Sequence, residues 1–304
     1  MEKLTVFTPT YNRAHTLPRT YESLCRQSCK NFIWLIVDDG SSDGTASLVQ
    51  SWQNHDSGFK IRYIYKENGG LHTAYNAAIA SLETELAMCI DSDDWLTDTA
   101  IEKILHKWHM EGSKQFAGIE ALDCYADGNI IGDLLPNRKT VNLIDLYVGK
   151  YHIRNGDRKP IVRSQLYKAV APMPTLNGEK NFNPHYLHLQ ISMDYDFLTM
   201  NEPVCIVEYQ NDGMSHHIFS QYLNSPNSFA QLRRLCMQFR NVPLSFQIKN
   251  AIHYDSSCIL SGHLSDVWKR SEKPFLTSSL LLPGFLLSVL TRFMVKNHPQ
   301  ENKQ

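Results

Sequence analysis

The segment Leu86-Ala87-Met88-Cys89-Ile90-Asp91-Ser92-Asp93-Asp94 joins an apolar run to a cluster of acids. The run predicts a strand that is buried on both faces, and the acids stand where that strand ends. Carboxylates this close repel one another, and Mg²⁺ or Mn²⁺ commonly binds one or two carboxylates together with substrate phosphates. The dipole of a following helix would account for Asp94 but not for all three acids. The segment therefore predicts a divalent-cation site with Asp91 and Asp93 as ligands.

The chain around this segment alternates strand and helix patterns. The predicted strands are Leu4–Thr8, Phe32–Val37, Ile61–Tyr65 and Leu86–Ile90, and the predicted helices are Thr16–Ser28, Ala46–Asn54, Leu71–Leu82 and Thr97–Met110. This alternation predicts an α/β fold in which a mostly parallel sheet has helices on both faces. Ligands of such sheets bind beyond the carboxyl ends of the strands, where this sequence is unusually polar.

Two more polar segments follow predicted strands. Asp38 and Asp39 end the second strand, and a carboxylate there can accept a hydrogen bond from a pyrimidine ring or a ribose hydroxyl. A turn with a helix cap would explain the Ser42–Gly44 part of this segment but not these two acids. Gly69 and Gly70 precede the third helix and could offer backbone N–H groups to an anion, although a plain loop is an equally simple interpretation.

Composition excludes several classes of protein. The 304 residues are 42% hydrophobic and 20% charged, which is enough to bury a core, and the formal net charge of −1 gives no general attraction to nucleic acid. The seven cysteines are irregularly spaced and form no CxxC pair, so we expect reduced thiols in a cytoplasmic protein. The first residues run directly into a strand pattern without an export signal.

Four segments together resemble glycosyltransferase family 2. They are Thr8-Pro9-Thr10-Tyr11-Asn12-Arg13, Val37–Thr45, Asn68–Gly70 and Asp91–Asp94, and both their order and their spacing agree with the family. The likeness is strong over roughly the first 110 residues and weaker to about residue 217. It implies the GT-A fold, a Rossmann-like nucleotide half joined to an acceptor half, and transfer from a nucleotide-sugar, often a UDP-sugar, with inversion at the anomeric carbon.

The resemblance also assigns roles to residues. Thr8, Tyr11 and Arg13 would line the nucleoside pocket beside Pro9, Asp38 or Asp39 would hold the base, and Asp93 would be the main ligand of Mn²⁺ or Mg²⁺. Asp91, with Ser92 beside it, would contact the ribose or the metal shell. The segment Asn68–Asn76, with Gly69, Gly70 and His72, is similar to enzymes of capsular and surface polysaccharide synthesis, which usually have Lys where this chain has Leu71.

An inverting transfer also needs a base that takes the proton of the acceptor hydroxyl. The segment around Gly178-Glu179-Lys180 resembles the acceptor-side part of the family, but Pro184-His185 stands where an acid is expected. Glu179, His185 and Asp194 therefore remain three candidates for the base. His216, in a family-like segment, is predicted to bind the metal or the diphosphate.

The last part of the sequence predicts helices over Phe229–Phe239, Ser245–Leu260 and Phe275–Val295. The third contains a charge-free run that Pro283-Gly284 interrupts, so we expect a helix in the membrane interface rather than one that spans it. A helix packed on the catalytic domain or in a homodimer interface is the alternative. A lipid-linked or saccharide acceptor would fit a position on the inner face of the plasma membrane.

The predicted organisation is a GT-A catalytic domain over 1–218, with a nucleotide-binding half (1–115) and an acceptor half (116–218), followed by a helical region over 219–304. A nucleotidyltransferase is disfavoured because Thr8–Arg13 contains no glycine, and a dehydrogenase because no GxGxxG follows the first strand. A nucleotide-sugar-binding protein without transferase activity is the remaining alternative.

Overall fold

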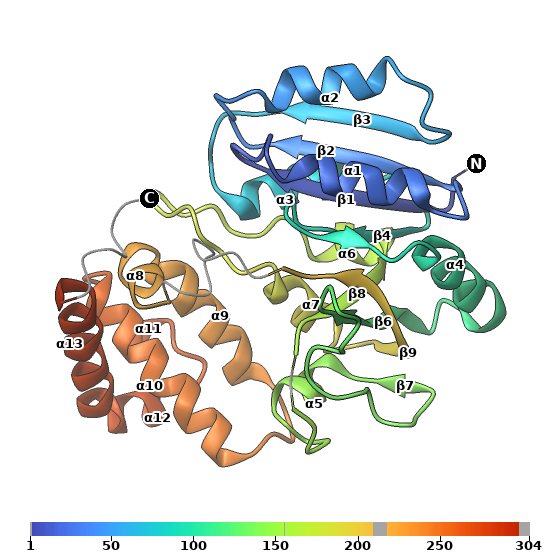
Figure 1. The fold of residues 1–304 in the computed structure, drawn as a ribbon. Coiled ribbons are helices and arrows are strands. Elements are labelled where there is room, and N and C mark those ends of the chain that lie inside the picture. Colours follow the sequence, from blue (N-terminus) through green and yellow to red (C-terminus); the bar gives the residue numbers. More distant parts are fainter. Residues whose placement is uncertain (1, 155, 209–217, 298–304) are drawn as a thin grey trace. The chain divides into compact units, whose positions relative to one another are not determined.

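The computed structural model describes residues 2–154, 156–208 and 218–297, which belong to two compact units (Figure 1). Unit 1 comprises Met1–Met173 with Leu187–Glu208, and unit 2 comprises Pro174–Tyr186 with Tyr209–Gln304. Each unit is described by itself below.

Unit 1 is built on one sheet, which has nine strands in the described part of the chain and the order β3-β2-β1-β4-β8-β6-β9-β5, with β7 beside β9. The strands are β1 (Leu4–Thr10), β2 (Phe32–Asp38), β3 (Lys60–Tyr65), β4 (Leu86–Cys89), β5 (Trp95–Leu96), β6 (Phe116–Cys124), β7 (Thr140–Val141), β8 (Arg158–Arg163) and β9 (Asp196–Ile206). The first four strands in this order are parallel, while β8 is antiparallel to both of its neighbours. The predicted α/β class is confirmed.

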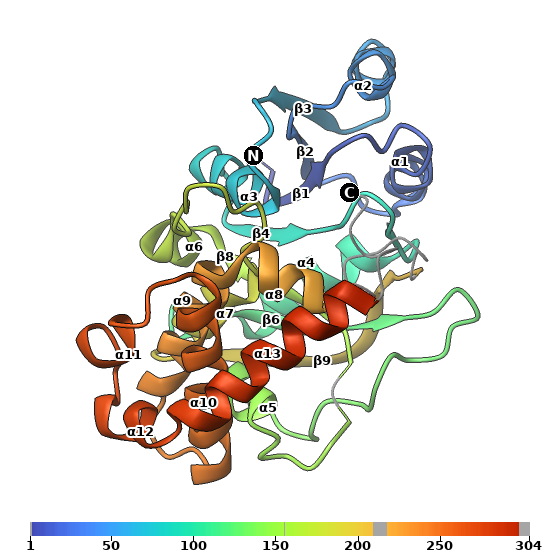
Figure 2. The ribbon, with the colours of Figure 1, turned by 90° about the vertical axis from the view of Figure 1, so that its left-hand side faces the viewer.

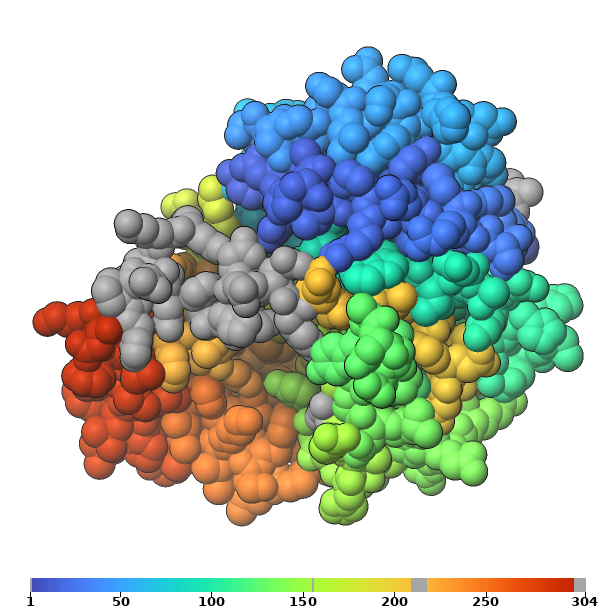
Figure 3. Space-filling view, viewed as in Figure 1, coloured from blue at the N-terminus to red at the C-terminus, as the bar shows by residue number. Residues whose placement is uncertain are grey.

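Helices flank this sheet. They are α1 (Leu17–Arg26), α2 (Thr45–Gln53), α3 (Leu71–Ala80), α4 (Ala100–Glu111), α5 (Leu143–Tyr147), α6 (Ser164–Val170) and α7 (His185–Ile191), the last of which begins in unit 2. In the space-filling view, the N-terminal residues lie together as one blue region of unit 1 (Figure 3). Every residue of β1 and β2 is buried, as the apolar runs of the sequence predict for central parallel strands.

The first strand is longer than the sequence suggests, because Pro9 lies inside it and does not end it. The carbonyl of Thr10 accepts from Asp39 toward β2, whereas the carbonyl of Phe7 accepts from Ile90 toward β4. Strand residues alternate between their two neighbours, so Pro9 faces the β4 side, beyond the last paired residue of β4. The missing N–H of Pro9 therefore costs no ladder hydrogen bond.

The fourth helix begins later than predicted. Instead of starting a helix, Thr97 is tied to β9, where its N–H donates to Val204 and its hydroxyl to the carbonyl of Pro203. The preceding residues pair with β9 as β5. This long-range pairing overrides the local helix signal, and α4 starts at Ala100.

Unit 2 is helical in its described part. Its helices are α8 (Ile218–Asn224), α9 (Pro226–Gln238), α10 (Leu244–Leu260), α11 (Asp266–Lys269), α12 (Pro274–Ser279) and α13 (Leu281–Asn297). The predicted single helix over Phe275–Val295 is therefore two helices, and the break falls at Leu280 and not at Pro283. Pro283 lies in the first turn of α13, where a backbone N–H has no intrahelical partner in any case. In the described residues, no helix is long and apolar enough to cross a bilayer.

The packing of α13 on α10 involves a buried carboxyl group. Asp255 of α10 is fully buried, and neither carboxylate oxygen has a hydrogen-bond partner in the described part of the chain. Burial alone raises the pKa of Asp255 to about 8. Its Cβ lies so close to Gly284 of α13 that a Cβ on that glycine would approach within 2.5 Å.

The raised pKa of Asp255 makes stability depend on pH. The folded state keeps the proton to higher pH than the unfolded state, whose carboxyl has a pKa near 4, so stability falls as pH rises between these values, by about 1.4 kcal/mol per pH unit. We predict that Asp255→Asn flattens this dependence and raises the free energy of unfolding at pH 8, as measured by urea denaturation at pH 5 to 8. Asp127→Asn at an exposed site serves as the control. Parallel pH profiles for wild type and Asp255→Asn would contradict the assignment.

Candidate nucleotide and metal site

The polar ends of the parallel strands meet at one edge of unit 1. Thr10 lies opposite Asp38 in the β1–β2 register, and Asp38 lies opposite Tyr65 in the β2–β3 register, so the segments that follow these strands start side by side. On the other side of β1, Phe7 lies opposite Cys89, two residues before Asp91. The four motif segments thus follow strands β1, β2, β3 and β4, which are neighbours in the sheet.

The first motif is tied to the second through Asn12. The backbone N–H of Asn12 donates to the Ser41 hydroxyl at 2.8 Å, and its side-chain oxygen accepts from the Ser42 N–H at 2.8 Å. Asn12 has a left-handed backbone, with φ of 53°, a conformation that Asn tolerates better than most residues. Asn12 was not among the predicted site residues. Its left-handed backbone nevertheless sets the direction of the chain at its two neighbours in the sequence, Tyr11 and Arg13.

The second motif is tied to the third through Asp39. Its carboxylate is buried and accepts from the backbone N–H of Gly69 at 3.0 Å and of Gly70 at 2.8 Å, and it also pairs with Lys66. The sequence suggested that these glycine amides bind an external anion, but here they bind an internal carboxylate. Gly40 makes this contact possible, because it has φ of +88° and a Cβ there would lie 2.8 Å from the Asn68 nitrogen.

Asp38 is also fully buried and is held by its own loop and by β3. One oxygen accepts from the Ser41 N–H at 2.7 Å and the other from the Tyr63 hydroxyl at 2.6 Å. Burial raises the pKa of Tyr63, and its hydrogen bond to the Asp38 carboxylate and the charge of that carboxylate add to the rise. Both acids of the second motif therefore hold the loops of the site in place, and their contact with a nucleotide base stays a prediction.

The remaining predicted residues of the nucleotide pocket differ in exposure. Thr8, Pro9, His72 and Ser92 are buried, and the Thr8 hydroxyl accepts from the Trp34 indole N–H at 3.0 Å. Tyr11 is 50% exposed and so has a face available to stack on a ligand.

The three acids after β4 divide into two kinds. Asp94 is buried and faces inward, whereas Asp91 is exposed and Asp93 is partly buried. Burial raises the pKa of Asp93, repulsion from Asp91 adds to the rise, and the positive charges of Arg13 and Arg19 oppose it. Two mutually repelling carboxylates at a surface fit a divalent cation that is also held by substrate phosphates.

The described residues contain no group of three or more His, Cys, Asp or Glu side chains that could hold a metal ion by themselves. The predicted site has only two carboxylate ligands, Asp91 and Asp93, and substrate phosphates would complete it, so it is smaller than a group of three side chains. His216, the third predicted ligand, lies outside the residues that the structure describes.

A buried lysine, Lys159, lies next to the inward-facing acid Asp94. It was not among the site residues predicted from the sequence. Lys159 of β8 lies 3.7 Å from a carboxylate oxygen of Asp94 and 3.7 Å from one of Asp123 on β6, and all three side chains are buried. Burial raises the pKa of Asp94 to about 8 and that of Asp123 to about 6, and Lys159 opposes both shifts. The antiparallel pairing of β8 with β4 and β6 brings this cation to the acids.

A second cation fixes the same loop from α1. Arg19 donates to the carbonyl of Asp93 at 2.6 Å, stacks on the Trp95 ring at 3.9 Å and pairs with Glu208. Thr20 of the same helix donates its hydroxyl to the carbonyl of Asp94 at 2.7 Å. The backbone of the acidic loop is therefore held independently of any ligand.

The three predicted bases have different surroundings. Both carboxylate oxygens of Glu179 accept hydrogen bonds at the start of α9, from Asn227 and Ser228, at 2.6 to 2.8 Å. Glu179 therefore caps a helix within unit 2. Burial lowers the pKa of His185 to about 4, which keeps its ring neutral near pH 7. Asp194 is exposed in unit 1.

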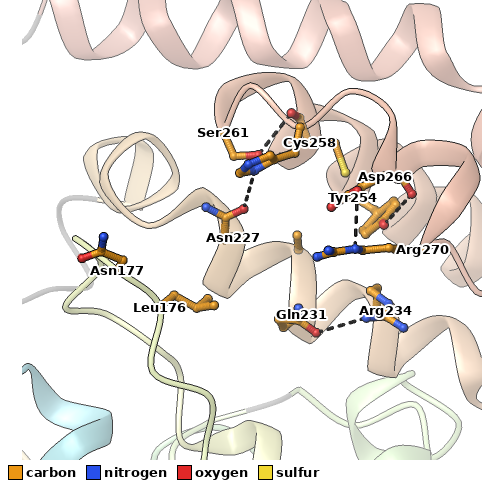
Figure 4. A pocket seen from close by; sticks show the side chains of 12 residues that line it. Leu176, Asn177, Asn227, Gln231, Arg234, Tyr254, Cys258, Ser261, Asp266 and Arg270 are labelled. Atoms are coloured by element: carbon orange, nitrogen blue, oxygen red, sulfur yellow. Dashed lines mark hydrogen bonds and ion pairs between the residues drawn. The ribbon is translucent and has the colours of Figure 1, made fainter.

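Unit 2 has a cavity of its own, with a volume of about 270 Å³. Its lining includes Gln231, Arg234, His263 and Arg270 (Figure 4). Arg234 pairs with Glu272 at 2.9 Å, and Arg270 pairs with Asp266 at 3.6 Å. The charges of both arginines in the cavity lining are therefore neutralised within unit 2.

The mixed α/β fold of unit 1 is similar to that of GT-A glycosyltransferases. Residues 5–119 match the family model Glycosyl transferase family 2, and this segment of the chain belongs to that family. The predicted resemblance is confirmed.

Curated relatives match the same region. Glycosyltransferase GlyA of Streptococcus pneumoniae is 31% identical over 106 residues, which are 35% of this chain and 15% of that protein. The putative teichuronic acid biosynthesis glycosyltransferase TuaG of Bacillus subtilis is 32% identical over 114 residues, 38% of this chain and 44% of that protein. The matched segments cover only 15% to 37% of the length of the first relatives, such as GlyA and an uncharacterized glycosyltransferase of Rickettsia typhi.

Solved structures share the fold over nearly the whole chain. S. aureus TarS 1-349 superposes with a TM-score of 0.61 at 14% identity, covering 99% of this chain and 92% of that one. The mannosyltransferase PcManGT from Pyrobaculum calidifontis, solved in complex with GDP-Man and Mn2+, gives a TM-score of 0.58 at 15% identity and covers 94% of this chain and 87% of that one. At these identities the likeness establishes the fold.

The buried lysine is testable by a double-mutant cycle. We predict that Lys159→Met lowers the free energy of unfolding by roughly 3–5 kcal/mol, because Asp94 and Asp123 remain buried without their cation. Adding Asp123→Asn should recover part of that loss, as measured by urea denaturation. The control Lys103→Met, which breaks an exposed pair with Glu202, should cost less than about 1 kcal/mol. Equal losses for Lys159→Met and Lys103→Met would contradict the assignment.

Proposed function

We propose that this chain transfers a sugar from a nucleotide-diphosphate sugar, a UDP-sugar, to a hydroxyl acceptor with inversion at the anomeric carbon. One observation carries the proposal: four motif segments of a glycosyltransferase family 2 domain follow neighbouring strands and lie at one edge of the sheet. TarS 1-349 of S. aureus has the same fold and is known in complex with UDP-GlcNAc, which supports the choice of donor.

The leaving diphosphate gains negative charge as the sugar bond breaks, and a bound Mn²⁺ or Mg²⁺ would neutralise that charge. Asp91 and Asp93 are the side chains that would hold the ion. Asp94 faces the buried Lys159 and so keeps the loop in place without competing for the ion. Tyr11 and Arg13, in the loop after β1, would contact the nucleoside and its phosphates.

We assign the base to Asp194 or His185, and Glu179 to the cap of α9. Burial lowers the pKa of His185, so its ring is unprotonated at neutral pH, and Asp194 is exposed. The four donors around Glu179 occupy both of its oxygens, so taking a proton there would break the cap.

The acceptor belongs to cell-surface polysaccharide synthesis in this proposal, because TuaG is named for teichuronic acid biosynthesis. A lipid-linked saccharide would place the enzyme in the cytoplasm at the inner face of the plasma membrane. Residues 1–218 would carry catalysis, and 219–304 would supply the membrane contact predicted for residues 275–296. Homodimer formation stays a prediction of the sequence.

The metal assignment is tested by donor hydrolysis and transfer with UDP-sugars and Mn²⁺. We expect Asp93→Ala to lower kcat by at least about a hundredfold, because the charge on the leaving group is no longer compensated. Asp98→Ala, an exposed acid on the same loop region, should leave kcat unchanged. Donor binding by the wild type without any turnover would favour a nucleotide-sugar-binding protein and overturn the proposal.

The base assignment is tested by Asp194→Asn and His185→Asn. One of the two should lower kcat by about 10²–10⁴ while donor binding is unchanged, since general-base catalysis contributes a factor of that size. Glu179→Gln should lower the free energy of unfolding and leave kcat within a few-fold of wild type. Full activity of both base variants, with loss of kcat in a stably folded Glu179→Gln, would return the role to Glu179.

A further inference from the structure

The helix α13 packs on unit 2 through small residues. Its buried positions are Gly284, Ser288, Thr291 and Val295, which recur at helical spacing and form one face. This face packs against α10, where Gly284 leaves no room for a side chain beside Asp255. Figure 2 shows α13 lying along α10 and α12 at the front of the view.

The opposite face of α13 is large and apolar. Its exposed residues are Leu282, Phe285, Leu286, Val289, Leu290 and Phe293, which are 47% to 68% exposed. These positions also recur at helical spacing, so they form one continuous stripe, and nothing in the described part of the chain covers it. Phe275 of the adjoining α12 is 92% exposed, and Trp268 of α11 is 48% exposed.

This arrangement reverses the usual pattern of a surface helix. A helix on a water-soluble domain turns its large apolar residues to the core and its polar residues to water. Helices in contact with lipid typically turn small residues toward the neighbouring helix and large apolar residues toward the acyl chains. An apolar surface of this extent on a soluble unit marks an interaction site.

The charges around the stripe indicate which partner it meets. From Pro274 to Asn297 the charged residues are Arg292 and Lys296, and no acid occurs in that range. Lys269 and Lys273 precede α12, while the neighbouring acids Asp266 and Glu272 are paired with Arg270 and Arg234. A cationic, aromatic-rich surface complements the anionic headgroups of a bilayer, whereas a second copy would bring the same positive charge.

We propose that α13, with Phe275 of α12, lies in the interface of an anionic bilayer and inserts its apolar stripe among the acyl chains near the headgroups. With 17 residues, α13 is too short to span a bilayer, so it lies parallel to the surface. This inference deepens the membrane contact of the proposed function. It rests on residues of unit 2 alone, so it stands or falls separately from the catalytic proposal.

The test is co-sedimentation of the full chain with vesicles of phosphatidylcholine alone and of phosphatidylcholine with phosphatidylglycerol. We expect binding to the anionic vesicles that weakens as salt is raised. The variant Phe285→Ser/Phe293→Ser should lose that binding about tenfold or more, and Arg292→Gln/Lys296→Gln should lose most of its dependence on salt and anionic lipid. The matched control is Leu244→Ser, which removes a 69% exposed apolar residue from the start of α10.

Three results would overturn the proposal. They are no binding to anionic vesicles, equal binding by wild type and Phe285→Ser/Phe293→Ser, and a dimer in solution that this variant dissociates, which would make the stripe an interface between copies. Donor hydrolysis without vesicles should be unchanged in the same variant. Loss of vesicle binding with intact hydrolysis therefore separates the membrane proposal from the catalytic one.

Discussion

The candidate site depends on how repulsion among the acids after β4 is relieved. Asp94 turns inward to Lys159, a cation that two antiparallel strand pairings bring beneath the loop. Arg19 and Thr20 of α1 hold the loop backbone by its carbonyls. Asp91 is exposed and Asp93 is partly buried, and burial together with repulsion from Asp91 raises the pKa of Asp93. Asp94 thus has a structural role, while Asp91 and Asp93 remain accessible to a ligand. A divalent cation is the ligand that would relieve the repulsion between Asp91 and Asp93.

The other motif segments form one hydrogen-bonded framework beside these acids. Asn12 joins the loop after β1 to the loop after β2, and Asp39 joins the loop after β2 to the start of α3. From the sequence, Asp39 and the two glycines before α3 were predicted to be separate ligand contacts. In the structure they form hydrogen bonds with one another. The loops of this edge are therefore fixed by one another, and Tyr11, Asp91 and Asp93 are the residues that we propose meet the nucleotide there.

The sequence predicted the part of the structure that local patterns determine. Apolar runs and helix-start patterns predicted β1 to β4 and α1 to α3 closely, because each is specified by neighbouring residues. Pro9 inside β1, the pairing of Trp95–Leu96 and the approach of Lys159 to Asp94 were missed, since each depends on strand pairing between distant segments. In the same way, the local sequence around Glu179 resembles that of a catalytic acid. Its hydrogen-bond partners at the start of α9 lie almost fifty residues away in the sequence, so local patterns could not reveal its capping role. Composition revealed that residues 275–296 are apolar, but only the packing on α10 shows which face of α13 is left outside.

The central claim is that Asp91 and Asp93 hold a divalent cation together with a nucleoside diphosphate. Electron paramagnetic resonance of Mn²⁺ measures this directly, because the signal of free Mn²⁺ falls when the ion binds. We expect UDP and the protein together to bind more Mn²⁺ than either does alone, and Asp93→Ala to abolish the excess while its fold is retained. Equal Mn²⁺ binding by wild type and Asp93→Ala, or UDP binding that EDTA leaves unchanged, would contradict this claim.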